Sequence, residues 1–150
     1  MSRWLKILLC AVAGGFGIAN WSISAGPQTA HEPVSSNETA AIYAIRTLHS
    51  TQVQYFSQFG RYAVSLKELG PPSSGAPGPE AAGLIDGELA SGAKAGYAFT
   101  MAGHAAGYVI HAHPQEYGKS GSRTFYSDQT MVIRQNHGPE LATADSPELK

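Results

Sequence analysis

The sequence predicts an α+β domain in which a long N-terminal amphipathic helix packs on a four-stranded antiparallel β-sheet. Two observations support this class. Apolar residues recur with the period of a helix from Ser35 to Phe59, and from Ala95 onward the pattern changes to the alternation of β-strands. A helix with one wide apolar side needs a partner layer in water. We therefore expect the late sheet to cover the apolar side of the early helix.

The predicted helix has its apolar residues on one side. On a wheel of about 3.6 residues per turn they share an arc of about 160°. The members are Ala41, Ile42, Ile45, Leu48, Val53, Tyr55, Phe56 and Phe59, and the arc is interrupted by His49 and Gln52. Ser35 and Glu38 have the spacing of a capping box, with Asn37 as a competing N-cap. Gly60 can take the left-handed conformation that ends a helix.

Weaker signals follow this helix. The segment 62–69 predicts a short helical turn, and Pro71–Pro79 is a loop on composition alone. Residues 80–90 have apolar residues at helical spacing, weakened by Gly83 and Gly87. We expect a second, shorter helix there.

Two hairpins are predicted in the last third of the chain. Residues 97–101 and 108–113 alternate around a glycine-rich turn, which predicts the first hairpin. Residues 123–127 and 131–134 are joined by a short polar turn, which predicts a second, tight hairpin. The predicted structural core comprises Ile42, Ile45, Leu48, Phe56, Phe59, Phe99, Ile110, Phe125 and Ile133.

The N-terminus has the composition of a targeting segment. Arg3 and Lys6 precede an apolar run over 7–18, and small residues follow up to Ala25. We expect either a signal peptide cleaved after Ala25 or an uncleaved membrane anchor within 7–24, with a buried core helix as the remaining alternative. The predicted organisation is a signal peptide or signal anchor at 1–25, a linker at 26–36, an α+β domain at 37–134 and an irregular, exposed tail at 135–150. In both cases we expect the domain to be exported, in the periplasm or outside the cell, or held at the inner membrane.

Charge and cysteine content exclude some classes of partner. The net charge is −1 and the basic residues are scattered, so we expect no nucleic-acid binding. Cys10 is the only cysteine, which excludes an intrachain disulfide and a cysteine-based metal site.

Five blocks of sequence follow one another between Asn37 and Leu149. They are NETAAIYAIRTLHSTQVQYFSQFGRYAVSLKELG, AAGLIDGELASGAKAGYAFT, YVIHAHP, SRTFYSDQTMVIR and TADSPEL. Together they resemble the globular head of type IV pilin-like proteins, above all the general secretion pathway protein G-like pseudopilins of type II secretion. The resemblance implies a pilin-like head, a structural role in the cell envelope, and other pilin-like or secretion-system subunits as partners.

The N-terminus departs from this resemblance. The family opens with a prepilin leader and a glutamate ahead of an unbroken apolar helix, whereas residues 1–27 read MSRWLKILLCAVAGGFGIANWSISAGP. That glutamate compensates charge within the bilayer in a filament. We therefore expect a pilin-like head used as a soluble or singly anchored protein.

Histidines supply the main candidate metal ligands. His111 and His113 lie two apart on a predicted strand, so both rings point to one face, and His104 lies in the preceding turn. Neutral imidazoles in such an arrangement can bind zinc or copper. The alternative interpretation is a polar, solvent-facing side of the sheet, and this is the one that we favour.

No cofactor is expected, with calcium as the other alternative considered. The resemblance implies a calcium loop near the C-terminus, where Asp128, Glu140 and Asp145 are oxygen donors. These residues lack the dense acidic spacing of a calcium loop. Enzyme motifs are equally weak: Ser91–Lys94 spells S-x-x-K, but the serine follows a predicted helix instead of opening one.

The sequence therefore predicts a non-enzymatic, pilin-like cell-envelope protein that acts through protein–protein contacts. The alternative is a stand-alone exported module that binds a small ligand or a metal. Its binding surface would be the loop at Pro71–Pro79 or the face that carries His111 and His113.

Overall fold

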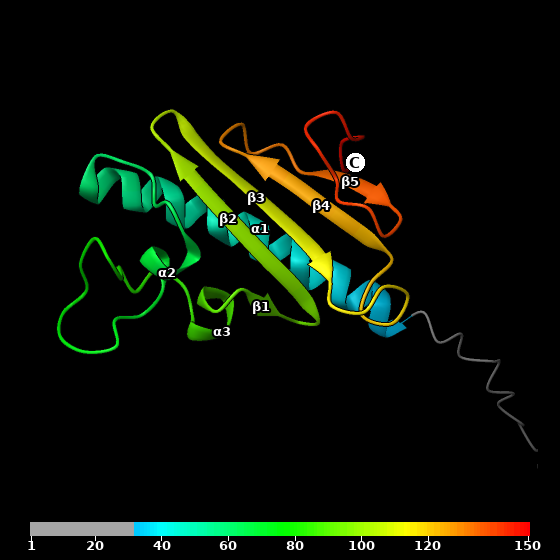
Figure 1. Cartoon of the computed structure of the whole chain (residues 1–150), viewed down its shortest axis with the longest axis horizontal. Coiled ribbons are helices and arrows are strands. Elements are labelled where there is room, and N and C mark those ends of the chain that lie inside the picture. Colours follow the sequence, from blue (N-terminus) through cyan, green and yellow to red (C-terminus); the bar gives the residue numbers. More distant parts are fainter. Residues whose placement is uncertain (1–31) are drawn as a thin grey trace, which may run out of the picture.

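The computed structural model describes residues 32–150, with side chains from Ser36 onward. A long helix lies across one face of an antiparallel sheet, which is in front of the helix in Figure 1. The elements are α1 (Glu32–Phe59), α2 (Leu66–Leu69), α3 (Gly87–Ala90), β1 (Ala93–Lys94), β2 (Tyr97–His104), β3 (Gly107–Pro114), β4 (Arg123–Asp128) and β5 (Arg134–His137). The strand order is β1-β2-β3-β4-β5, so each strand pairs with the next one in the chain.

The predicted α+β class is confirmed, but the sheet has five strands where four were predicted. The additional strand is β1, whose two residues pair with the start of β2 across a turn at Ala95 and Gly96. Both turn residues have positive φ angles, 49° and 74°. A strand of two residues is too short to show alternation, so the sequence pattern could not reveal it.

The first hairpin is confirmed and the second is wrong in its register. β2 and β3 pair along their whole length, from Tyr97 with Pro114 to His104 with Gly107. In the second hairpin Tyr126 pairs with Arg134, so β5 begins where the predicted strand ends. Residues 129–133 form a loop and do not pair with β4. Within this loop the carbonyl oxygen of Val132 accepts a hydrogen bond of 2.8 Å from the Ser127 hydroxyl.

α1 begins at Glu32, three residues before the predicted start, and so takes up part of the predicted linker at 26–36. Pro33 is compatible with a first turn, because the N–H that it lacks would have no helical acceptor there. The predicted capping box is wrong, since Ser35 lies within the helix and the Glu38 side chain bonds to residues before β4 and at its start. The targeting segment predicted at 1–25 lies outside the described residues.

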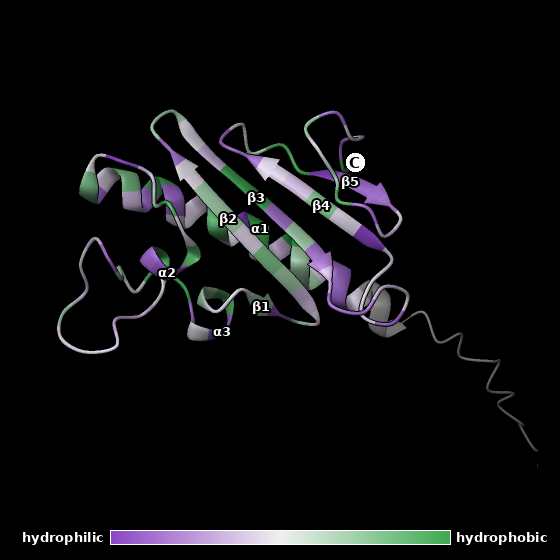
Figure 2. Ribbon diagram, viewed as in Figure 1, coloured by the Kyte–Doolittle hydropathy of each residue, from purple (hydrophilic) through white to green (hydrophobic). Residues whose placement is uncertain are grey.

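The core lies between α1 and the sheet. Hydrophobic and hydrophilic bands alternate along α1 in Figure 2. Of the predicted core residues, Ile45, Leu48, Phe99, Ile110, Phe125 and Ile133 are buried, and Ile42 and Phe59 are partly buried against them. Phe56 was assigned wrongly, because its side chain is 45% exposed. Near its C-terminal end α1 is covered only in part, and the Phe56 ring contacts Tyr62 at a centroid distance of 4.9 Å.

The segment after α1 is less helical than predicted. The predicted short turn is present as α2, but the helix predicted over 80–90 is reduced to α3. The carboxylate of Asp86 caps α3 by accepting a hydrogen bond from Leu89 N at 2.8 Å. Before it, Ala82 N donates to the carbonyl oxygen of Glu68 at 2.7 Å. Backbone donors that a helix would use internally therefore bond to the α2 segment instead.

The tail was predicted to be irregular and exposed over 135–150, and this is wrong in two respects. Most of β5 lies within it, and Ala142 is fully buried. We call residues 139–149 the C-terminal strap. After β5 the strap crosses the face of the sheet opposite α1 and then runs beside β5, where Glu148 forms an antiparallel bridge with Arg134.

Candidate functional site

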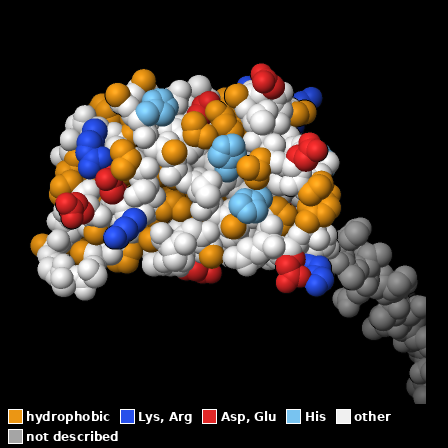
Figure 3. All heavy atoms as spheres, in the orientation of Figure 1, with side chains coloured by type: hydrophobic (Ala, Val, Ile, Leu, Met, Phe, Trp, Pro, Cys, Tyr) orange, Lys and Arg blue, Asp and Glu red, His pale blue; other side chains and the backbone are white. Residues whose placement is uncertain are grey.

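Polar side chains collect on the outer face of the sheet, opposite α1. Alternation places Thr100 of β2, His111 and His113 of β3, and Tyr126 of β4 on this face. In Figure 3, which looks onto this face, histidine side chains (pale blue) lie between hydrophobic side chains (orange) and other atoms (white). The predicted shared face of the two β3 histidines is therefore present in the fold.

The surroundings of His111 favour its neutral form. Its ring meets the edge of Tyr126 at a centroid distance of 5.3 Å. Burial lowers the pKa of His111, and the charge of His113 acts in the same direction, while a hydrogen bond with the backbone of Ala142 in the strap opposes both.

These histidines are poorly arranged for a metal bound at Nε2. The Nδ1 atoms of His111 and His113 are both buried without a hydrogen-bond partner. A metal bound at Nε2 would place a proton on each Nδ1, which has no acceptor, whereas metal-bound histidines almost always donate that proton to one. His104 lies four residues along β2 from Thr100, the partner of His111, which is about 13 Å at about 3.3 Å per residue. The three candidates therefore do not converge.

The calcium candidates are not brought together either. The Asp128 carboxylate accepts hydrogen bonds from the backbone N–H and the hydroxyl of Thr130, at 2.9 and 2.6 Å. Burial acts to raise the pKa of Asp128, but these bonds outweigh it and the pKa is lowered. Glu140 and Asp145 lie in the strap with exposed side chains. Among residues 32–150, no group of three or more histidine, cysteine or acidic side chains is placed to hold a metal ion.

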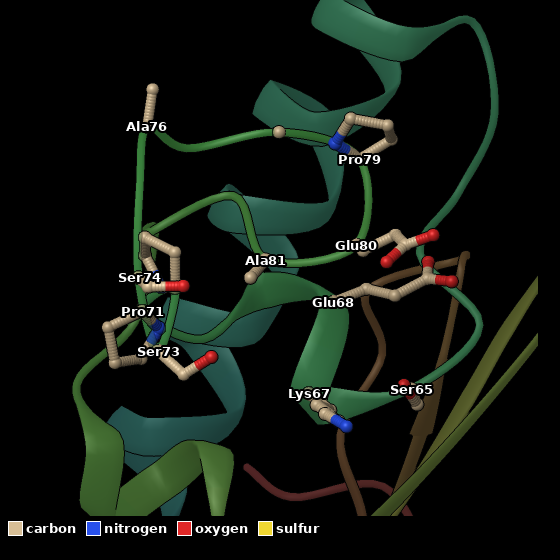
Figure 4. A pocket seen from close by; sticks show the side chains of 12 residues that line it. Ser65, Lys67, Glu68, Pro71, Ser73, Ser74, Ala76, Pro79, Glu80 and Ala81 are labelled. Carbon is tan, nitrogen blue, oxygen red and sulfur yellow. The ribbon is translucent and has the colours of Figure 1, made fainter.

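A pocket of about 770 Å³ lies beside the proline-rich loop. It is lined by Ser65, Lys67, Glu68, Pro71, Pro72, Ser73, Ser74, Ala76, Gly78, Pro79, Glu80 and Ala81. Figure 4 shows the carboxylates of Glu68 and Glu80 on the same side of it. The Glu68 carboxylate already accepts hydrogen bonds from Arg61 at 2.9 Å and from Val64 N at 3.0 Å. The pocket can therefore offer a ligand mainly hydroxyls, proline rings, the Lys67 ammonium group and Glu80.

A buried histidine that interrupts the apolar side of α1 joins the helix to two strands. His49 Nδ1 lies 2.8 Å from the Tyr108 hydroxyl, and His49 Nε2 lies 2.8 Å from Ser127 Oγ. Ser127 donates its own proton to Val132, so it accepts from Nε2–H, and Tyr108 donates to Nδ1. This assigns a neutral ring with the proton on Nε2. Ser127 is fully buried and its proton is committed, so the pair is not arranged as a nucleophile and its base.

Burial shifts the pKa values of both His49 and Tyr108 toward the neutral form. Burial lowers the pKa of His49, and the charge of Asp128 opposes the shift. Burial also raises the pKa of Tyr108 to about 12, so its hydroxyl keeps its proton at neutral pH.

Two further polar side chains anchor α1. The buried carboxylate of Glu38 accepts hydrogen bonds of 2.8 Å from Ser122 N, Ser122 Oγ and Arg123 Nε. The amide of Gln52 both donates to and accepts from the backbone of Ala63, at 2.9 Å each. Interruptions of an apolar arc were the available signal for His49 and Gln52, but no local pattern pointed to the partner of Glu38. Glu38 and His49 fix how α1 lies on the sheet, and Gln52 fixes the loop after α1 against the helix.

Comparison with protein-family models, with curated proteins and with solved structures finds no match for this chain. Within residues 32–150, no helix has the length and apolar content that crossing a bilayer requires. The candidate anchor at 7–24 lies outside this range.

Proposed function

We propose that this chain is a pilin-like protein of the cell envelope that acts through protein–protein contacts and not through catalysis. Its head would be exported, and it would be either anchored through residues 7–24 or released after cleavage. Its partners would be other pilin-like or secretion-system subunits.

The observation that carries this proposal is the way α1 is used. The helix buries one stripe against a sheet whose strands follow one another in sequence, and its other side is left to solvent. α1 begins at Glu32, and the apolar run that we interpret as a targeting segment ends at residue 18. Such a layout suits a head that is presented from a membrane or an assembly.

The polar chemistry of the described residues supports a structural role. The buried side chains Glu38 and His49 hold α1 on the sheet, and Gln52 holds the loop that follows α1. Buried polar networks of this kind specify one packing arrangement when each member has a partner. Tyr43 is 62% exposed on the solvent side of α1 and provides an aromatic contact point for a partner.

Site-specific photo-cross-linking tests the proposal. A benzophenone amino acid replaces Tyr43 in the chain expressed in its native host, and adducts are identified by mass spectrometry. Replacement at Lys119, on the exposed loop between β3 and β4, is the matched control. We expect position 43 to yield an adduct with a pilin-like or secretion-system subunit. Adducts with cytoplasmic proteins only, at both positions, would contradict it.

A soluble exported binding module is the second candidate, favoured by the pocket of about 770 Å³ beside the proline-rich loop. The mature N-terminus separates this module from the anchored form of the pilin-like protein. A terminus near Gly26 in the periplasmic fraction favours the soluble module, and an intact first residue in the membrane fraction favours the anchored protein.

A further inference from the structure

The C-terminal strap is held at the free edge of β5 by backbone hydrogen bonds. Gln135 N donates to the carbonyl oxygen of Pro147 at 2.9 Å. Leu149 N donates to the carbonyl oxygen of Ile133 at 2.8 Å. This is the pattern by which an extended peptide adds to the edge of a sheet.

Side chains make this edge selective for the strap sequence. The Arg134 guanidinium donates to the carbonyl oxygen of Ser146 at 2.9 Å and pairs with the Glu148 carboxylate at 3.3 Å. Leu149 is partly buried against the hydrophobic core. The edge of β5 therefore suits a short peptide in which an acidic residue is followed by an apolar one.

A second contact lies on the outer face of the sheet. The Thr124 hydroxyl donates to the carbonyl oxygen of Glu140 at 2.6 Å and accepts from Ala142 N at 2.9 Å. Asn136 Nδ2 also donates to the Glu140 carbonyl, at 3.1 Å. A single threonine thus holds the strap from two sides.

The strap lies outside the five-stranded ladder. Most of its side chains are exposed, and only Ala142 is fully buried. It is joined to β5 through Gly138 and Pro139, and a Cβ on Gly138 would approach only the side chain of Asn136. Regions with few buried contacts open locally at the lowest free-energy cost.

We infer that two copies of this chain exchange C-terminal straps, so that the strap of one copy occupies the β4–β5 surface of the other. A second copy offers the same backbone groups, the same glutamate for Arg134 and the same leucine. The contacts are then equal in the closed and the exchanged forms. The two forms differ in how their populations depend on protein concentration. A short linker holds its own strap at an effective concentration of about 1 mM, so the exchanged form becomes favoured where the concentration of heads reaches that level.

This inference goes beyond the proposed function, because it names a second copy as a partner and a defined segment as the link. It holds for an anchored and for a soluble chain, since it requires only a high local concentration of heads.

Cysteine pairing tests the exchange in the full chain. Cys10→Ser provides the background, one chain carries Arg134→Cys, and a second chain, made heavier by a tag inserted between Ser74 and Gly75, carries Glu148→Cys. The two positions are partners in an antiparallel bridge, for which a Cα separation of about 4.5 Å is normal and a disulfide is allowed. The control mixture replaces Arg134→Cys by Ser57→Cys, at an exposed position on α1.

We expect the test mixture, oxidised at about 1 mM, to form at least about ten times more mixed disulfide dimer than the control. A single chain with both cysteines checks the geometry, because it must form the bond within itself at low concentration. If that chain closes its own disulfide while the mixture gives no more dimer than the control, the strap stays on its own head and the inference is wrong. Failure of the doubly substituted chain to form any disulfide would overturn it as well, since the strap would then not lie beside β5.

Discussion

Replacement of His49 tests the buried contact that joins α1 to β3 and β4. His49→Gln removes the titratable group and keeps a polar side chain, while Tyr108→Phe removes one hydrogen-bond partner and keeps the histidine. Because burial lowers the pKa of His49 in the folded protein, the unfolded chain binds a proton below about pH 6.5 that the folded protein does not bind. Stability is therefore full above that pH and falls as the pH decreases below it.

The size of the effect follows from proton linkage. One proton taken up only by the unfolded chain lowers the free energy of unfolding by about 1.4 kcal/mol per pH unit. His111, whose pKa is also lowered by burial, adds to the slope of the wild type but not to the difference from His49→Gln. The loss of the tyrosine hydroxyl in Tyr108→Phe should cost about 1 kcal/mol at every pH.

Urea denaturation followed by circular dichroism between pH 7.5 and 5.5 measures these quantities. We expect the wild-type curve to fall more steeply with decreasing pH than that of His49→Gln, and the Tyr108→Phe curve to lie below the wild type with the acid-dependent loss retained. Parallel curves for wild type and His49→Gln would mean that the ring takes up a proton as easily in the folded protein as in the unfolded one. The assignment of His49 as a buried, neutral histidine would then be wrong.

Four further substitutions test packing and the strap. Ile45→Asp places a carboxylate in the core and should unfold the domain, whereas Phe56→Asp should change the urea midpoint little; equal losses would refute the assignment of the buried stripe. Gly121→Ala places a methyl group 2.1 Å from the Tyr97 hydroxyl and should destabilise by about 1–3 kcal/mol, and an unchanged melting temperature would argue against this close approach. Thr124→Val keeps the shape but removes the hydroxyl that holds the strap, so backbone amides at 140–149 should exchange faster with solvent while those of β2 and β3 do not; unchanged exchange would contradict the strap contact.

Periodicity predicted the elements whose environment is uniform along their length. Alternation gave the facing sides of β2 and β3, because Phe99 and Ile110 face one continuous helix. The helical wheel placed Ile45 correctly but failed at Phe56, since a wheel describes the direction of a side chain and not where the covering sheet ends.

Elements that depend on distant partners were not predictable in the same way. β5 is hydrophilic throughout, as Figure 2 shows, so it lacks the alternation that marks a strand and is defined by its pairing with β4. Glu38 was interpreted as a local cap, but its partner Arg123 lies 85 residues further along the chain. Likewise, the face that carries His111 and His113 was expected, and its cover by the strap was not.

The location of the head tests the central proposal most directly. With an epitope inserted between Ser74 and Gly75, where the backbone is exposed, protease is added to intact cells, to spheroplasts and to lysed cells, and the epitope is followed by immunoblotting. We predict that the head is degraded in spheroplasts while a cytoplasmic marker protein survives. An epitope that is degraded only after lysis, together with that marker, would place the head in the cytoplasm and contradict the proposed role in the cell envelope.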